Sequence, residues 1–319
     1  MFKLFENIFE PSRPKADRLP EDLLDAAIER AVDGTDPRLK MLSAYDNKLR
    51  GPVARAVQYV IRLVDELPAA EPLQAETLAN NPALAAIFYS AERLQRIVEQ
   101  DTELKSFRKL NPLNPEPVNA LLLVSTTQKK TIGTALVDDK MRKDVAQTSV
   151  DFHDQRFMAP ARIEAETRDL LKRRAFDHLL LVAMSRIARQ GQQRQELQAH
   201  RAVMQSKLRL MTRSGGFHHQ HGHGLEEQAG LQGKMEKIEQ KLAALGPDEK
   251  VLPSNLAMVL EVLENAKDHL WLDHTSLCLD RYYVLHSKPE RGAPAIDFMQ
   301  IHGTDADTLI IRLVALPPG

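Results

Sequence analysis

The sequence predicts an α+β protein, with an N-terminal helical domain followed by an antiparallel β-sheet domain that carries an inserted antiparallel helical (coiled-coil) hairpin. Three observations predict this class. Aromatic residues make up 5% of the chain and glycine only 14 of 319 residues, a composition that favours helix. Three prolines between residues 111 and 117 interrupt the first helical region. Beyond them, apolar residues recur with a period of two, which is typical of strands.

The helical domain is expected over residues 17–110, after a short amphipathic segment and linker at 1–16. Apolar residues at helical spacing predict helices over 20–33, from Pro52 onward, and over 82–110. Prolines at the starts of these segments suit the first turn of a helix.

Residues 111–319 are expected to form the α+β domain, with a helical insertion at 161–272. β-Branched runs predict strands over 118–126, 131–138 and 146–157, separated by polar turns at 127–130 and 138–144. Three more strands are expected over 276–286, 295–302 and 308–316. We expect both groups in one sheet, because either group alone would leave long open edges.

The projecting hairpin is predicted at residues 192–245. Residues 161–213 form a helical stretch of about 52 residues, or ~78 Å, so this helix must break or project. Its outgoing arm, 192–212, and a return helix, 225–245, have equal lengths and flank a glycine-rich turn. Apolar residues at coiled-coil spacing line both helices: Leu197, Met204, Leu208 and Met211 on the arm, and Leu231, Met235, Ile238, Leu242 and Leu245 on the return.

Composition narrows the functional classes. The 43 basic and 44 acidic residues give a net charge of −1, which argues against a protein that is basic overall and wraps nucleic acid. The single cysteine, Cys278, excludes an internal disulfide and fits a reducing compartment, so we expect the cytoplasm. The mean hydropathy is −0.35, and no apolar run approaches the ~18 residues of a transmembrane helix.

A histidine-rich turn joins the two helices of the hairpin. His218, His219, His221 and His223 could together bind a borderline cation such as Zn²⁺, Ni²⁺ or Cu²⁺. The spacing differs from that of rigid structural zinc sites. The favoured alternative is a polar loop tip with incidental histidines, so no cofactor is predicted.

The outgoing arm is locally basic, with seven basic residues and one acidic residue between positions 185 and 213. A projecting basic hairpin could bind an acidic protein or a phosphate backbone. No aromatic residues are interleaved to stack bases, so sequence-specific or single-strand recognition of nucleic acid is disfavoured. The favoured alternative is a solvated face of a polar helix. The candidate interaction residues are Arg194, Arg201, Lys207, Arg209 and Arg213.

Phe2, Phe5 and Phe9 share one helical face of the N-terminal segment. Such a segment could rest at a membrane surface, but its single base, Lys3, would attract anionic lipid weakly. Docking on this chain's own helices or on a partner is the favoured alternative.

Catalytic motifs are mostly missing, since the chain has no phosphate-binding glycine loop, no dinucleotide-binding glycine motif and no nucleophile elbow. Asp151 and His153 alternate onto one face of a predicted strand and are the candidates for acid–base chemistry. Their default role is on the solvated face of a sheet.

These observations predict a non-catalytic interaction or adaptor protein that binds a protein partner or a second copy through its coiled-coil arm. A metal-responsive protein using residues 218–223 and an enzyme with an Asp/His site on the sheet are the alternatives.

Overall fold

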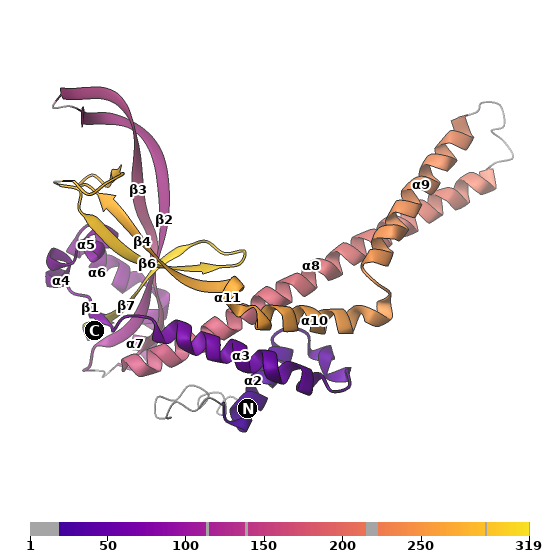
Figure 1. Cartoon of the computed structure of the whole chain (residues 1–319), viewed down its shortest axis with the longest axis horizontal. Helices are drawn as coiled ribbons and strands as arrows, with labels where there is room; N and C mark the ends of the chain where they lie inside the picture. The colour runs from indigo at the N-terminus through magenta and orange to yellow at the C-terminus, as the bar shows by residue number, and fades with distance from the viewer. Residues whose placement is uncertain (1–18, 113–114, 138–139, 215–222, 291, 319) are drawn as a thin grey trace. The chain divides into compact units, whose positions relative to one another are not determined.

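The computed structural model describes residues 19–112, 115–137, 140–214, 223–290 and 292–318, without the side chains within 134–143 and 210–229. It confirms the α+β class: N-terminal helices precede a mainly antiparallel seven-stranded sheet, and a long helix is inserted between strands (Figure 1). No helix among the described residues is both long and apolar enough to cross a membrane.

Two compact units make up the chain, and each joins segments that are distant in the sequence. Among the described residues, unit 1 contains those within Met1–Leu23, Ala54–Leu179 and Asn265–Gly319, and unit 2 contains those within Leu24–Val53 and Leu180–Glu264. Helices α3 (Tyr45–Asp65) and α8 (Glu164–Ser214) run through both units. Independent folding of residues 17–110 remains a prediction.

The sheet of unit 1 joins the two predicted groups of strands. Its strand order is β3 (Lys140–Ala161), β2 (Val118–Val137), β7 (Leu309–Leu316), β6 (Ala295–Gly303), β4 (Leu270–Leu279) and β5 (Leu285–His286). β2 pairs with β7 from Val118 opposite Leu316 to Ser125 opposite Leu309, so the strands form one sheet as expected. β1 (Glu71–Pro72) lies parallel to β7.

The predicted turn at residues 127–130 is wrong, because β2 continues without a break to Val137. Lys129 lies opposite Ser149 and Lys130 opposite Thr148, so β3 satisfies the backbone of this polar stretch. β2 pairs with β7 only as far as Ser125. Beyond that point β2 pairs with β3 alone, while β3 also forms an isolated bridge from Ser149 to Val284. Residues 128–130 of β2 are exposed, so their polar side chains need not pack against the core.

Short helices cover one face of the sheet: α4 (Ala75–Asn80), α5 (Pro82–Phe88), α6 (Ala91–Gln100) and α7 (Thr102–Leu110). Phe88 and Leu104 share a buried core with Leu122, Phe152 and Val314 of the strands. The single helix predicted over 82–110 is therefore wrong. Its segments end before two new caps, where Ser90 accepts from the Arg93 N–H and Asp101 accepts from the Leu104 N–H.

The opposite face of the sheet packs against α3 and the first part of α8. Val64 and Leu171 of these helices are buried with Leu121 and Leu313. Arg168 donates to the backbone carbonyls of Val64, Leu67 and Pro68 at 2.8–2.9 Å, which joins α8 to the end of α3. α3 begins at Tyr45 rather than at the predicted Pro52, which lies inside the helix. A short helix, α11 (Ala266–His269), leads into β4.

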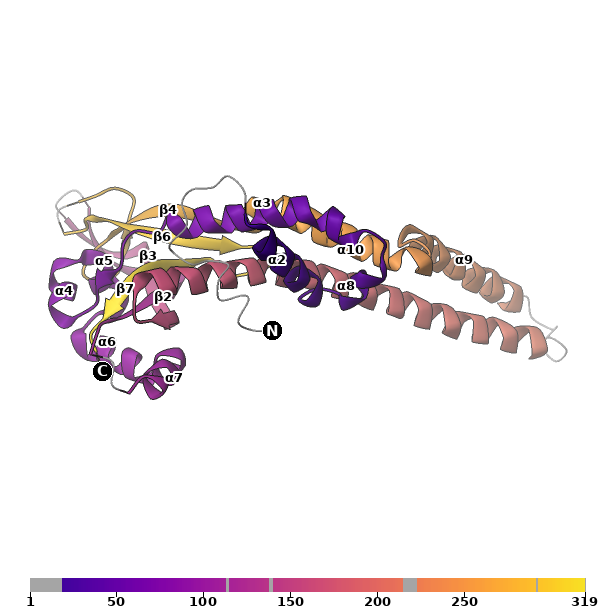
Figure 2. The same cartoon turned by 90° about the horizontal axis from the view of Figure 1, so that it is seen from below.

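Unit 2 contains α2 (Glu21–Asp33) from Leu24 onward, η1 (Pro37–Met41), η2 (Asp248–Lys250), α10 (Val251–Glu264), α9 (His223–Ala244) and the remainder of α8. Asn255 of α10 donates to the buried Asp36 carboxylate at 2.8 Å, and Asp36 caps η1. α8 continues through Gly191 for 51 residues without a break. Its outer part lies beside the returning α9 (Figures 1 and 2).

Candidate functional sites on the sheet and the helical hairpin

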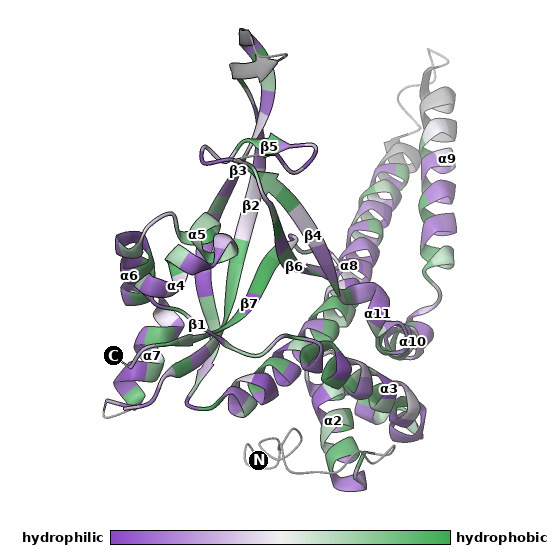
Figure 3. Cartoon of the chain, turned by 60° about the vertical axis from the view of Figure 1, so that its left-hand side comes forward, coloured by the Kyte–Doolittle hydropathy of each residue, from purple (hydrophilic) through white to green (hydrophobic). Residues whose placement is uncertain are grey.

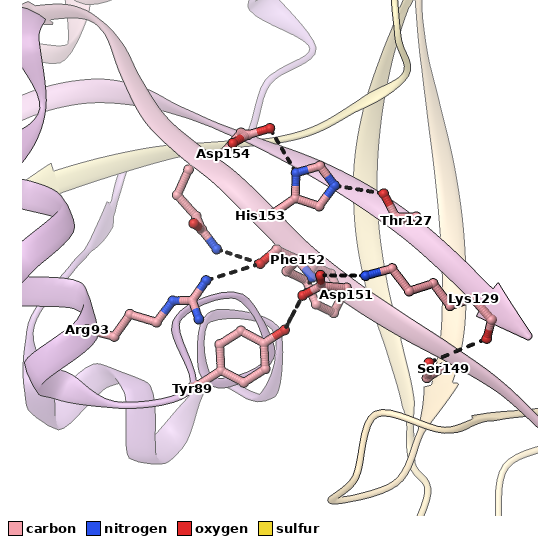
Figure 4. Close-up of polar contacts among 10 residues, drawn as sticks. Tyr89, Arg93, Thr127, Lys129, Ser149, Asp151, Phe152, His153 and Asp154 are labelled. Atoms are coloured by element: carbon pink, nitrogen blue, oxygen red, sulfur yellow. Dashed lines mark hydrogen bonds and ion pairs between the residues drawn. The ribbon is translucent and has the colours of Figure 1, made fainter. Parts of the chain in front are cut away.

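Asp151 and His153 lie on β3, an edge strand of the sheet, and are separated by the buried Phe152 (Figure 4). Alternation along the strand places both side chains on the face opposite Phe152, as the sequence predicts. Their side chains are 47% and 37% exposed, so neither is enclosed.

Asp151 is held by a tyrosine and a lysine. The Tyr89 hydroxyl donates to Asp151 Oδ1 at 3.3 Å, and Lys129 Nζ lies 3.6 Å from Asp151 Oδ2. Tyr89 ends α5 with a positive φ of 61°, and its hydroxyl also accepts from the Phe152 N–H at 3.2 Å. Burial raises the pKa of Tyr89 above its ordinary value, which keeps the phenol protonated and able to donate.

His153 lies between a hydroxyl and a carboxylate. Its Nε2 is 2.7 Å from Thr127 Oγ1, and its Nδ1 is 2.8 Å from Asp154 Oδ2. Asp154 has a positive φ of 52° at a register shift between β2 and β3. This bulge conformation lets a carboxylate contact the imidazole of the preceding residue.

The chain of Thr127, His153 and Asp154 has the order hydroxyl, imidazole, carboxylate. In that order the carboxylate orients the ring, and the ring can accept the hydroxyl proton. The arrangement lies on an open face, with Asp154 78% exposed, so bulk water screens it. A cavity of about 190 Å³ in unit 1 contains His274 and Asp297 but none of these three residues.

The sequence could not identify Thr127 as a partner of His153, because the strand that carries it reads as a turn. The sequence shows that His153 and Asp154 are adjacent, but it does not show the bulge that brings their side chains together.

The described residues also show no metal-binding geometry. In that part of the chain, no three His, Cys, Asp or Glu side chains form a group that could hold a metal ion.

The basic candidates on the hairpin have different environments. Arg194 is only 14% exposed, pairs with Asp248 at 2.7 Å and donates to the carbonyls of Leu245 and Gly246, just beyond the end of α9. Arg201 Nε lies 3.5 Å from Glu239 Oε1 of α9. Lys207 and Arg209 are exposed. The Arg213 side chain lies outside the described residues.

Two further predicted sites fall outside the described residues. His218, His219 and His221 lie between α8 and α9, and His223 is described only as backbone at the start of α9. Phe2, Phe5 and Phe9 precede residue 19. The metal and membrane hypotheses for these residues therefore stay predictions.

Comparison with protein-family models, curated proteins and solved structures finds no match to this chain. Its function must therefore be inferred from its own residues.

Proposed function

We propose that this chain is a non-catalytic interaction or adaptor protein whose binding arm is the hairpin of α8 and α9, residues 192–245. One observation carries the proposal. In the arm beyond Arg194, none of the side chains described over 195–209 and 230–244 is fully buried. The arm therefore adds no buried core to unit 2, yet ordering its backbone costs roughly 1–2 kcal/mol per residue. A segment of this kind is well suited to presenting a surface.

The burial pattern supports a two-stranded antiparallel coiled coil. Apolar residues at the predicted seam positions are half-buried: Leu197, Met204 and Leu208 of α8, and Leu231, Met235, Ile238 and Leu242 of α9. Most of the residues between them are exposed, and hydrophilic residues predominate along α9 in Figure 3. Alternating spacings of three and four residues are those of a coiled-coil seam.

The decisive experiment replaces residues 192–245 with a short glycine-containing turn. Purified full-length and armless chains are used as baits in extracts of the source cells, and each recovered protein is then tested in a reconstituted pairwise binding assay. A direct partner of the full chain that fails to bind the armless chain supports the proposal. Light scattering after gel filtration tests self-association in parallel.

The comparison requires that the armless chain is folded. Its circular dichroism should show the helix and strand content expected for the full chain without residues 192–245. Identical partners and identical mass for the two folded chains would contradict the proposal. The single cysteine, Cys278, is free, which is compatible with the cytoplasmic location that we propose.

An enzyme with an Asp/His site on the sheet is the second candidate, favoured by the hydrogen-bonded chain of Thr127, His153 and Asp154. A serine/threonine-directed fluorophosphonate probe should then label Thr127, and His153→Gln should abolish labelling. Labelling that is absent or independent of His153 counts against this candidate.

A metal-responsive role through residues 218–223 predicts a fixed stoichiometry in calorimetric titration with Zn²⁺ or Ni²⁺. Unchanged binding by the variant with alanine at all four histidines would exclude that role.

A further inference from the structure

The two sides of the hairpin arm differ in charge pairing. On one side, Arg201 of α8 contacts Glu239 of α9. Each residue of a helix advances about 100° around its axis, so Glu236 projects from the same side of α9 as Glu239, and Arg209 from the same side of α8 as Arg201. Acidic and basic residues are therefore mixed on this side.

The other side of α9 carries a row of lysines. Lys234, Lys237 and Lys241 follow one another at i, i+3 and i+7, so they lie within about 60° of each other and span about 10 Å along the axis. They are separated from Glu236 and Glu239 by the width of the helix. All three lysine side chains are exposed.

Lys207 of α8 extends this row across the seam. Because Arg201 lies opposite Glu239 and the helices are antiparallel, Lys207 comes level with Gly233 and next to Lys234. Lys207 is two residues, or about 200°, from Arg209, so it lies on the side away from the Arg201 ion pair. None of the four lysines forms an ion pair with a carboxylate among the described residues.

An exposed apolar side chain lies within this row. Val203 is one turn from Lys207 on α8, is level with Lys237 of α9, and is 50% exposed. Lys207, Lys234, Lys237 and Lys241 together with Val203 are called the lysine face below.

We propose that the lysine face binds an acidic amphipathic helix of a partner protein, an inference that rests on the proposed interaction function. Lysines at i, i+3 and i+7 match the carboxylate spacing of a helix packed alongside, and Val203 offers that helix an apolar contact. Lysines also neutralise the phosphates of duplex nucleic acid, but such a backbone offers no apolar partner for the exposed Val203, so a duplex is the weaker fit.

The inference can be tested with the full chain and synthetic 21-residue helical peptides. The first peptide carries leucines at coiled-coil seam positions flanked by glutamates, and a matched peptide carries lysines in place of the glutamates. Fluorescence anisotropy at 50 mM and 200 mM salt should show binding of the acidic peptide only, weakening several-fold at the higher salt because the pairs are exposed. Carbodiimide coupling should join its carboxylates to Lys207 or Lys234.

Variants of the chain locate the binding surface. Reversing all four lysines to glutamate (K207E, K234E, K237E and K241E) should weaken binding of the acidic peptide at least 10-fold and create binding of the basic peptide. Changing the same four to arginine should preserve binding. Lys250→Glu, at an exposed lysine of η2 outside the arm, is the control and should change the affinity less than twofold. Circular dichroism should show equal helix content in all variants.

Three results would overturn the inference: no binding of the acidic peptide, binding that survives the four reversals, or lysine-dependent binding of a 24-base-pair duplex DNA without binding of the peptide. After any of these three results, the proposed interaction function would remain supported if a partner binds the full chain but does not bind the armless chain. If instead the partner binds the full and the armless chain equally while the acidic peptide still binds the lysine face, the proposed interaction function of the arm is contradicted.

Discussion

Arg194 connects the start of the arm to the end of the returning helix, so its removal should loosen α9 locally. The guanidinium donates to the Leu245 and Gly246 carbonyls at 2.8 and 2.9 Å, and its side chain is 14% exposed. Arg194→Ala removes both bonds and leaves carbonyls at a helix end without these donors. Its pairing with Asp248 adds little, because that carboxylate is 77% exposed.

The expected cost is set by these two bonds. A single hydrogen bond to a charged group is worth about 1.5–3 kcal/mol, but water can reach both carbonyls once the arginine is gone. We therefore expect a loss of about 1–2 kcal/mol, confined to the arm. This corresponds to a 5- to 30-fold fall in the protection of α9 amides against hydrogen exchange.

Hydrogen exchange read by mass spectrometry measures this directly. Arg194→Lys should recover less than half of the protection, because one ammonium group lacks the fork of donors that reaches both carbonyls. Arg209→Ala, an exposed arginine on the same helix, should leave protection unchanged. The reasoning is refuted if Arg194→Ala exchanges like the wild type in α9, or if lysine substitutes fully.

Other predictions concern unit 1. Phe152→Ala, at a fully buried position, should lower the free energy of unfolding by about 3–5 kcal/mol in urea denaturation; a loss below 1 kcal/mol would mean that Phe152 is not central to the core. Burial lowers the pKa of His178 below its ordinary value of 6.5, so unfolded chains bind the proton more tightly. Stability should fall as the pH drops below 6.5, and by less in His178→Gln; parallel pH curves would contradict this. Gly303→Ala places a Cβ 3.0 Å from His178 Nε2 and should lower the free energy of unfolding by about 1 kcal/mol. If Gly303→Ala lowers it equally when His178 is already alanine, the contact with His178 is not the cause.

The sequence pattern anticipated features that depend on repetition along one element. The apolar spacing on residues 197–245 predicts positions that are half-buried in the structure, and the alternation around Asp151 and His153 placed both on one face. Both inferences use helix and strand geometry alone.

Features that depend on distant partners could not be predicted in the same way. The polar stretch 127–130 resembles a turn, but β3 supplies its hydrogen-bonding partners. Tyr89 adopts a positive φ at the end of α5, and its hydroxyl contacts β3, which is more than 60 residues away in the sequence. The sequence pattern indicates that Arg194 is one of several basic residues on the surface. In the structure it is largely buried because it donates to carbonyls about 50 residues further along the chain.

The placement of β7 has a consequence for how the protein is made. β7 pairs with β2, β6 and β1, and it is the last described strand along the chain. At 5–20 residues per second, a ribosome that has finished β2 needs roughly 10–30 s to reach β7. During that time the edge of β2 that will bind β7 has no partner, and open strand edges are prone to pair with other chains. Newly synthesised chains should therefore depend on chaperones until β7 emerges.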